Sequence, residues 1–321
     1  MPLESSALDA AAVPDQRKSQ LYDDLLEALY ATFGVNPGYR VAHAKGMLVT
    51  GTFIPSVQAK QLSRAMHFQR PTPIVVRFSN FSGLPTTPDP DPLASPHGFA
   101  VRFDIGHGQY TDIVGHSFNG FPVGTPEDFL GFLRGIAASS ATPPNSAPLD
   151  EFLQKHPNAK AFLDADRSAP ASYASLSYFG VNAFRFINHQ GVVTVGRYRI
   201  EPVGVAALDD SSRSHASGNN YLRDELLSRL HVHPVEFRLM LQLPSPGDTI
   251  DDGSIAWSDN NEKVCLGTLR LDRAVEPQRG DAMQRAMSFS PGRLTDGIEP
   301  SADPMIAARD EIYRRALLRR R

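Results

Sequence analysis

The run Arg40-Val41-Ala42-His43-Ala44-Lys45-Gly46 decides how the rest of the sequence is interpreted. It places a histidine three residues after an arginine and directly before the strand-forming run 47–53. A histidine whose pKa lies near neutrality can take a proton from a bound molecule and return it. A lone histidine is more often a structural residue bonded to a carbonyl, so a second stretch is needed to choose between these interpretations.

That second stretch is DPMIAARDEIYRRALLRRR at residues 303–321, which predicts a helix. Ser301 or Asp303 can cap its start, and Pro304 suits a first turn because its missing N–H costs nothing there. Arg309 and Tyr313 are four residues apart and therefore share a face. A fixed cation beside a phenol favours the ionised phenolate, and a heme iron can take tyrosine as its axial ligand. Surface packing is the commoner fate of such a spacing.

Together the two stretches resemble the heme catalases. Arg-x-x-His-Ala-Lys-Gly is similar to their distal-histidine motif, and Phe289-Ser290-Pro291-Gly292, followed by 297–301 and Arg309-x-x-x-Tyr313, is similar to their proximal segment. The chain stops where larger catalases continue, as in the catalase-related peroxidases, or mini-catalases. The resemblance runs from about Tyr39 to the C-terminus and is strongest at 39–53, 72–129 and 287–313.

The resemblance implies an α+β fold, a catalase-like antiparallel β-barrel with flanking α-helices and heme buried between the barrel and the C-terminal helix. The sequence pattern agrees, because β-rich runs at 73–79, 98–105 and 110–114 are separated by turn and loop residues. Apolar residues at helical spacing predict a helix over 18–33. We expect residues 1–17 to form a mobile arm and 18–321 a single heme-binding domain.

Composition excludes several classes of function. Charged residues make up 21% of the 321 residues and the net charge is −3, which gives no electrostatic case for nucleic acid. No apolar run approaches the roughly 20 residues of a membrane span, and no secretory signal is seen, so we expect a cytoplasmic protein. The single cysteine, Cys265, excludes an internal disulfide.

Five residues are expected to hold the cofactor from its distal side and edge. Arginine pairs well with carboxylates, so the resemblance implies that Arg40 and Arg77 bind the two propionates of heme b, with Ser79 and Val41 nearby. Arg77 lies in an apolar strand and needs an anionic partner, which an Asp or Glu would supply as well as a propionate. Phe121 is expected to pack on the heme face, although a strand Phe is more commonly plain core.

The run 112–123 departs from the catalase pattern. Larger catalases place an asparagine here that hydrogen-bonds the peroxide, and that position falls on His116 in this chain, while Asn119 lies three residues later. Either side chain can donate a hydrogen bond. Asn119 is favoured because it matches the residue type. Ala42 stands where catalases commonly have Val, which leaves more room beside His43 for bulkier hydroperoxides.

The predicted function is a heme peroxidase in which Tyr313 ligates the iron, Arg309 stabilises the phenolate and His43 relays the peroxide proton. The substrates are hydrogen peroxide or organic hydroperoxides with a small organic reductant, with weak catalase activity. Rearrangement of a fatty-acid hydroperoxide, as in allene oxide or epoxyalcohol synthases, stays open, as does a non-catalytic heme carrier or sensor. The resemblance also implies a homodimer.

Overall fold

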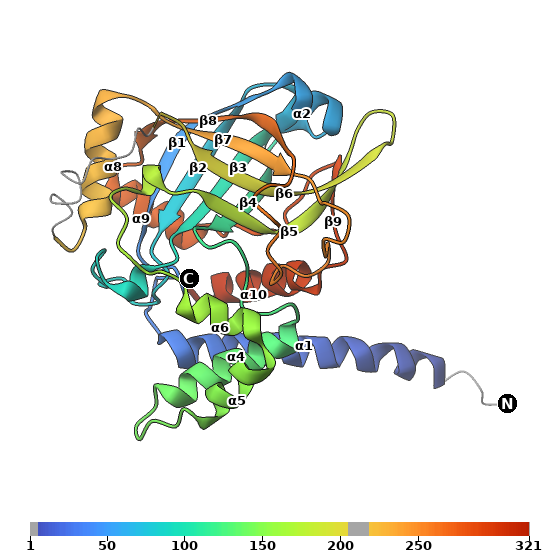
Figure 1. The fold of residues 1–321 in the computed structure, drawn as a ribbon, viewed down its shortest axis with the longest axis vertical. Coiled ribbons are helices and arrows are strands. Elements are labelled where there is room, and N and C mark those ends of the chain that lie inside the picture. Colours follow the sequence, from blue (N-terminus) through green and yellow to red (C-terminus); the bar gives the residue numbers. More distant parts are fainter. Residues whose placement is uncertain (1–5, 205–217, 321) are drawn as a thin grey trace.

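A closed antiparallel β-barrel forms the centre of the computed structural model, which describes residues 6–204 and 218–320, with side chains from Gln16 onward (Figure 1). Within these ranges the strand order is β4-β3-β2-β1-β8-β7-β6-β5-β9. A pairing of His116 in β4 with Phe179 in β5 closes the barrel, and β9 adds to β5. The strands are β1 (Gly46–Pro55), β2 (Thr72–Ser79), β3 (Gly98–Gly106), β4 (Gln109–His116), β5 (Tyr178–Ile187), β6 (Val193–Pro202), β7 (Val235–Gln242), β8 (Lys263–Ala274) and β9 (Ile298–Pro300).

The barrel interior is packed with aromatic and aliphatic side chains. Phe53, Phe78, Phe99, Phe103 and Phe237 are all buried in one core cluster, and the rings of Phe78 and Phe99 meet edge to face at 5.2 Å. Successive side chains of a strand point to opposite faces, so their neighbours in sequence point outward. The outer face of β2, β3 and β4 is therefore free to build a site.

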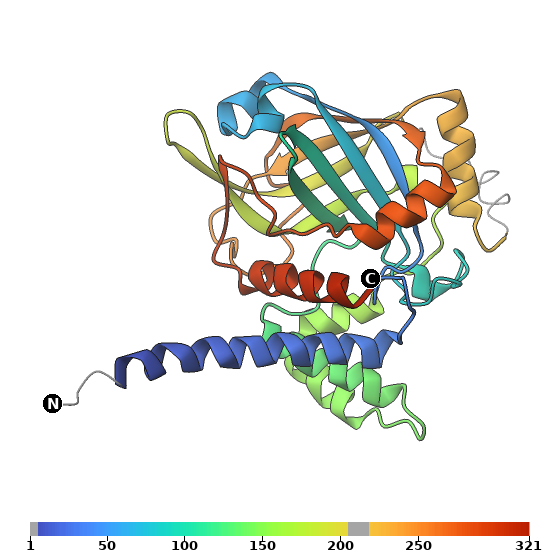
Figure 2. The ribbon, with the colours of Figure 1, turned by 180° about the vertical axis from the view of Figure 1, so that it is seen from behind.

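Helices cover that outer face (Figures 1 and 2). The C-terminal helix α10 lies between the barrel and the long helix α1, and α1 also packs on α4. The helices are α1 (Ser6–Phe33), α2 (Val57–Leu62), α3 (Met66–Gln69), α4 (Pro126–Ser139), α5 (Ala147–Lys155), α6 (Pro157–Asp164), α8 (Tyr221–Val232), α9 (Pro277–Ala286) and α10 (Pro304–Arg320), with short 3-10 turns η1 (Pro92–Ala94) and η2 (Tyr173–Ser175). The expected α+β barrel with flanking helices is confirmed.

The first helix begins earlier than predicted. It was predicted to begin at Lys18 and begins at Ser6, so residues 6–17 of the expected arm are helical, while residues 1–5 lie outside the described residues. Four alanines in this segment, at 7 and 10–12, explain the difference, because alanine has the highest helix propensity. Among the residues that the structure describes, no helix combines the length and the apolar character that crossing a membrane requires.

Candidate active site

Two rows of side chains run across β2, β3 and β4 on the outer face of the barrel. Strand register aligns Ser79 with Gly98 and Gly98 with His116 in one row. The next row aligns Arg77 with Ala100 and Ala100 with Val114. All six residues line one cavity of about 520 Å³ that is enclosed on its other sides by α1, α4 and α10. The small residues in the middle strand leave room above it.

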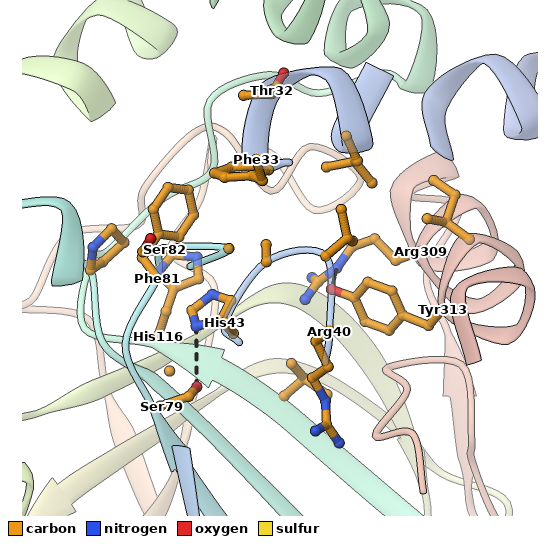
Figure 3. A pocket seen from close by; sticks show the side chains of 18 of the residues that line it. Thr32, Phe33, Arg40, His43, Ser79, Phe81, Ser82, His116, Arg309 and Tyr313 are labelled. Carbon is orange, nitrogen blue, oxygen red and sulfur yellow. Dashed lines mark hydrogen bonds between the residues drawn. The ribbon is translucent and has the colours of Figure 1, made fainter. Parts of the chain in front are cut away.

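His43 enters this cavity from the segment before β1 (Figure 3). Its Nδ1 lies 3.1 Å from the hydroxyl of Ser79. The imidazole of His43 can lie here because residue 98 is glycine: a Cβ at this position would lie 2.8 Å from His43 Nδ1 and 2.5 Å from Ser79 Oγ. Burial, and then the nearby positive charge of Arg77, lower the pKa of His43 well below its usual range. The ring is therefore neutral at physiological pH and able to accept a proton.

His116 presents a second neutral imidazole to the same cavity. The backbone N–H of Phe118 donates to His116 Nδ1 over 3.3 Å, so the neutral ring carries its proton on Nε2. Burial, and then the charge of Arg309, lower the pKa of His116 to about 3. Nε2 is buried and has no hydrogen-bond partner among the described residues. It is thus an unused donor beside His43.

Asn119, which the sequence favoured over His116 as the donor, lies elsewhere. It is in the turn after β4 has ended, outside the cavity lining, and its amide donates to Asp259 over 3.4 Å. The barrel register explains the difference, because only His116 is in the row with Ser79. The structure brings His116 to the site and leaves Asn119 out of it.

Tyr313 and Arg309 approach the cavity from α10, as the helical spacing predicted (Figure 3). Arg309 Nε donates to the Tyr313 hydroxyl oxygen over 3.2 Å. Arg309 Nη1 donates to Asn182 Oδ1 over 2.7 Å, and Asn182 donates to Asp303 over 2.7 Å. Asp303 also caps α10 by accepting from the N–H of Met305. The same hydrogen-bond network therefore caps the start of α10 and orients Arg309.

The expected residues Val41 and Phe121 also line the cavity. The Phe121 ring centroid lies 5.6 Å from the guanidinium carbon of Arg309 and 5.3 Å from the Phe129 ring centroid. Phe121 thus sits on the side of the cavity that carries Tyr313. Val41 packs against the cluster formed by α1, α4 and α10.

Three arginines gather at one end of the cavity. Arg40 and Arg320 both donate to the carbonyl of Met287, over 2.9 Å and 2.7 Å. Burial, and then the charges of Arg77 and Arg320, lower the pKa of Arg40 well below its usual range, and burial lowers the pKa of Arg77 to about 9. Among the described residues, neither Arg40 nor Arg77 pairs with a carboxylate, so the Asp or Glu considered for Arg77 is not present.

Arg320 was not singled out from the sequence. Its side chain is buried and lines the cavity. The helical spacing could have indicated this position. Arg320 follows Tyr313 by seven residues, which is close to two full helical turns, so the two residues share a face. Arg319, one position earlier, does face outward and pairs with Glu27 on α1.

Comparison with known proteins agrees with this geometry. The catalase family model matches residues 35–321. Catalase-related peroxidases of Synechococcus elongatus and Mycolicibacterium paratuberculosis are 34% and 35% identical to the chain; each alignment covers 91% of this chain, and 86% and 92% of those proteins. A fungal catalase structure (TM-score 0.74, 21% identity) and a bacterial one (0.73, 23%) share the fold over 89% of this chain, which spans 60% and 58% of theirs.

The chain belongs to the catalase family. This is a family of heme-dependent oxidoreductases that act on peroxides, and heme is the cofactor that membership implies.

The residues present fit such a group. Arg40 and Arg77 are buried without a carboxylate partner among the described residues, which is costly, and heme carries two carboxylates that would meet them. The rest of the cavity is mostly apolar, as a macrocycle requires, and the Tyr313 oxygen faces it.

Proposed function

We propose that this protein is a heme peroxidase that reduces hydrogen peroxide or organic hydroperoxides with a small organic electron donor. The observation that carries the proposal is the placement of His43 and the Arg309–Tyr313 pair on one cavity. Two relatives that the chain matches over most of their length bear the name catalase-related peroxidase, which supports the same reaction class.

In this proposal no thioether bond links the porphyrin of heme b to the chain. Tyr313 would ligate the iron through its oxygen, with Arg309 stabilising the phenolate charge, while Arg40, Arg77 and Arg320 would bind the propionates. A c-type attachment needs two cysteines, and the chain has one. Bound heme would supply the iron and the redox capacity needed to break the O–O bond.

The chain itself would handle the proton. In the tautomer that carries its proton on Nδ1 and donates it to Ser79, the neutral His43 ring has a lone pair on Nε2 that would accept the proton of the incoming peroxide. The same nitrogen then returns it to the oxygen that leaves as water or as an alcohol. His116 Nε2–H, which lacks a partner among the described residues, would hold the peroxide by a hydrogen bond.

The extent and the lining of the cavity support organic hydroperoxides as substrates alongside hydrogen peroxide. It extends past His43 between α1, α4, α6 and the loop 81–96, and this part is lined mainly by apolar side chains. Leu84 and Leu93 of that loop are 50% and 59% exposed, so the extension reaches the surface. Ala42 adds space close to His43.

The test is steady-state turnover of hydrogen peroxide and of cumene hydroperoxide by the heme-loaded protein with a phenolic donor. Donor-dependent consumption of both supports the proposal. Conversion of a fatty-acid hydroperoxide without any donor would instead identify the rearrangement activity. Stable heme binding without turnover of any of these would identify a carrier, a role for which two neutral imidazoles at the cavity would have no use.

A further inference from the structure

The backbone of His43 is held in an unusual conformation. Its φ is +56°, and His107 is the other non-glycine residue with a positive φ among those the structure describes. L-residues other than glycine adopt this region rarely, and they keep it only where the surroundings enforce it. His107 lies in a two-residue hairpin turn, where such a value is ordinary. His43 is not in a hairpin, so its surroundings must hold it.

Part of the restraint comes from the backbone. The N–H of His43 donates to the carbonyl of Phe81 over 2.8 Å, and the N–H of Ala44 donates to the carbonyl of Ser82 over 3.0 Å. The first bond holds the peptide unit before His43. The N–H of Ala44 lies in the same planar peptide unit as the carbonyl of His43, so the second bond holds that unit by its N–H edge and leaves the carbonyl oxygen on the opposite edge.

Arg77 fixes that carbonyl. Its Nη2 donates to the carbonyl of His43 over 2.9 Å and to that of Ala44 over 3.3 Å. The guanidinium occupies the space beside Gly46, where a Cβ would lie 2.6 Å from Nη2. Arg77 itself is 3% exposed, so its position is determined by its hydrogen bonds and packing.

Gln284 of α9 orients the opposite edge of this guanidinium. Its Oε1 accepts from Arg77 Nε over 2.8 Å. A neutral acceptor fixes the plane of the guanidinium and leaves its positive charge available to the cavity, which a carboxylate would neutralise. The helix that carries Gln284 is separated from His43 by more than 230 positions in the sequence, yet one side chain connects them.

We propose that Gln284 is a positioning residue that acts through Arg77 to hold His43 in its proton-accepting orientation. The inference deepens the proposed function, because it rests on His43 as the proton-transfer group. Gln284 does not line the cavity and would not touch cofactor or substrate. Loss of its oxygen would let the Arg77 guanidinium rotate and release the His43 carbonyl.

The test compares Gln284→Met with Gln278→Met, the same substitution at an exposed position of the same helix. The first readout is amide hydrogen exchange at His43 and Ala44 in the heme-free protein, followed by mass spectrometry of the 40–46 region. Gln284→Met should exchange faster there, whereas Gln278→Met should match the wild type. Because amide exchange does not depend on catalysis, this readout tests the positioning role of Gln284 even if the protein is not a peroxidase.

The second readout is kcat/KM for hydrogen peroxide in the heme-loaded protein. A misplacement of 1 Å costs on the order of 100-fold, and a partial release should lower kcat/KM by about tenfold. The rate is expressed per bound heme, because Arg77 would also bind a propionate, and the KM for the donor should not change. Gln284→Glu, which keeps an oxygen acceptor for Arg77 Nε, should restore wild-type amide exchange at His43 and Ala44. Wild-type exchange in Gln284→Met would overturn the proposal, as would exchange in Gln284→Glu that is as fast as in Gln284→Met.

Discussion

Arg309 Nε donates a hydrogen bond to the phenol oxygen of Tyr313 across one turn of α10, over 3.2 Å. The remaining guanidinium edge is fixed by Asn182 of β5 over 2.7 Å. A barrel strand therefore sets the direction of a helix side chain that would stabilise the iron ligand.

Replacing Tyr313 with Phe should remove or sharply weaken heme binding, because phenylalanine offers the iron no ligand atom. Titration of the apoprotein with hemin, followed by the Soret band, measures this. Tyr110→Phe is the matched control, since Tyr110 is 42% exposed on β4 and does not line the cavity. A normal tyrosinate-type spectrum in Tyr313→Phe would refute the ligand assignment.

Replacing His43 with Ala should lower kcat/KM for peroxide by about 100- to 10,000-fold, the usual contribution of a general acid–base group. Heme content should stay at the wild-type level, because His43 would not ligate the iron. His231→Ala, at an exposed position of α8, controls for loss of a histidine. Retained activity in His43→Ala would mean that another group moves the proton.

Two substitutions of His116 distinguish the effect of losing its N–H donor from the effect of losing its imidazole ring. Loss of one neutral hydrogen bond costs about 1 kcal/mol, so His116→Leu should raise the KM for peroxide or lower kcat/KM about fivefold. His116→Asn keeps an N–H donor and should retain more of the rate. Equal rates in both variants would show that the unpartnered Nε2–H takes no part in binding peroxide.

The acid limb of the pH–rate profile should lie well below pH 6.5. Burial and the charge of Arg77 lower the pKa of His43, so the ring stays in its neutral, proton-accepting form as the pH falls through 6.5. Measurement of kcat/KM for hydrogen peroxide between pH 5 and 8 tests this. A loss of rate centred at pH 6.5 would show that His43 titrates as an ordinary exposed histidine.

A histidine inside the barrel makes the fold acid-sensitive. His67 packs against Phe68 and Phe103 with ring centroids at 4.1 Å and 4.6 Å, and burial lowers its pKa from 6.5 to about 3. Neither ring nitrogen has a hydrogen-bond partner among the described residues. Between these pKa values the unfolded chain binds a proton that the folded chain does not, so the free energy of unfolding falls as the pH drops.

For His67 this term is about 2 kcal/mol between pH 7 and pH 5. His67→Leu should remove it, which flattens the dependence of the free energy of unfolding on pH by that amount. Urea unfolding at the two pH values measures the difference. If the free energy of unfolding of His67→Leu fell as much between pH 7 and pH 5 as that of the wild type, the acid sensitivity would come from other groups.

The sequence predicted the parts of the site that short motifs carry. His43, Arg309 and Tyr313 lie within fixed local spacings, and the structure brings all three to the cavity. The choice between His116 and Asn119 was out of reach, because it depends on the register of β4 against β3. Arg77 was placed correctly, but its bond to Gln284 joins two segments that no local pattern connects.

Helix α9, which carries Gln284, was not predicted at all. Nine of its ten residues are exposed or half-buried, and the buried one is Gly280, so the helix lacks the apolar stripe by which an amphipathic helix is recognised. Asn182 and Asp303 were also missed as the support of Arg309. Their roles arise from a contact between β5 and α10, elements more than 100 residues apart.

We propose that this cavity holds a tyrosine-ligated heme that turns over peroxide. The most direct test is the absorption spectrum of the purified protein after hemin is supplied, before and after addition of hydrogen peroxide and a phenolic donor. We expect a Soret band of the high-spin ferric tyrosinate type, together with oxidation of the donor. A protein that shows no Soret band after hemin is added would contradict it.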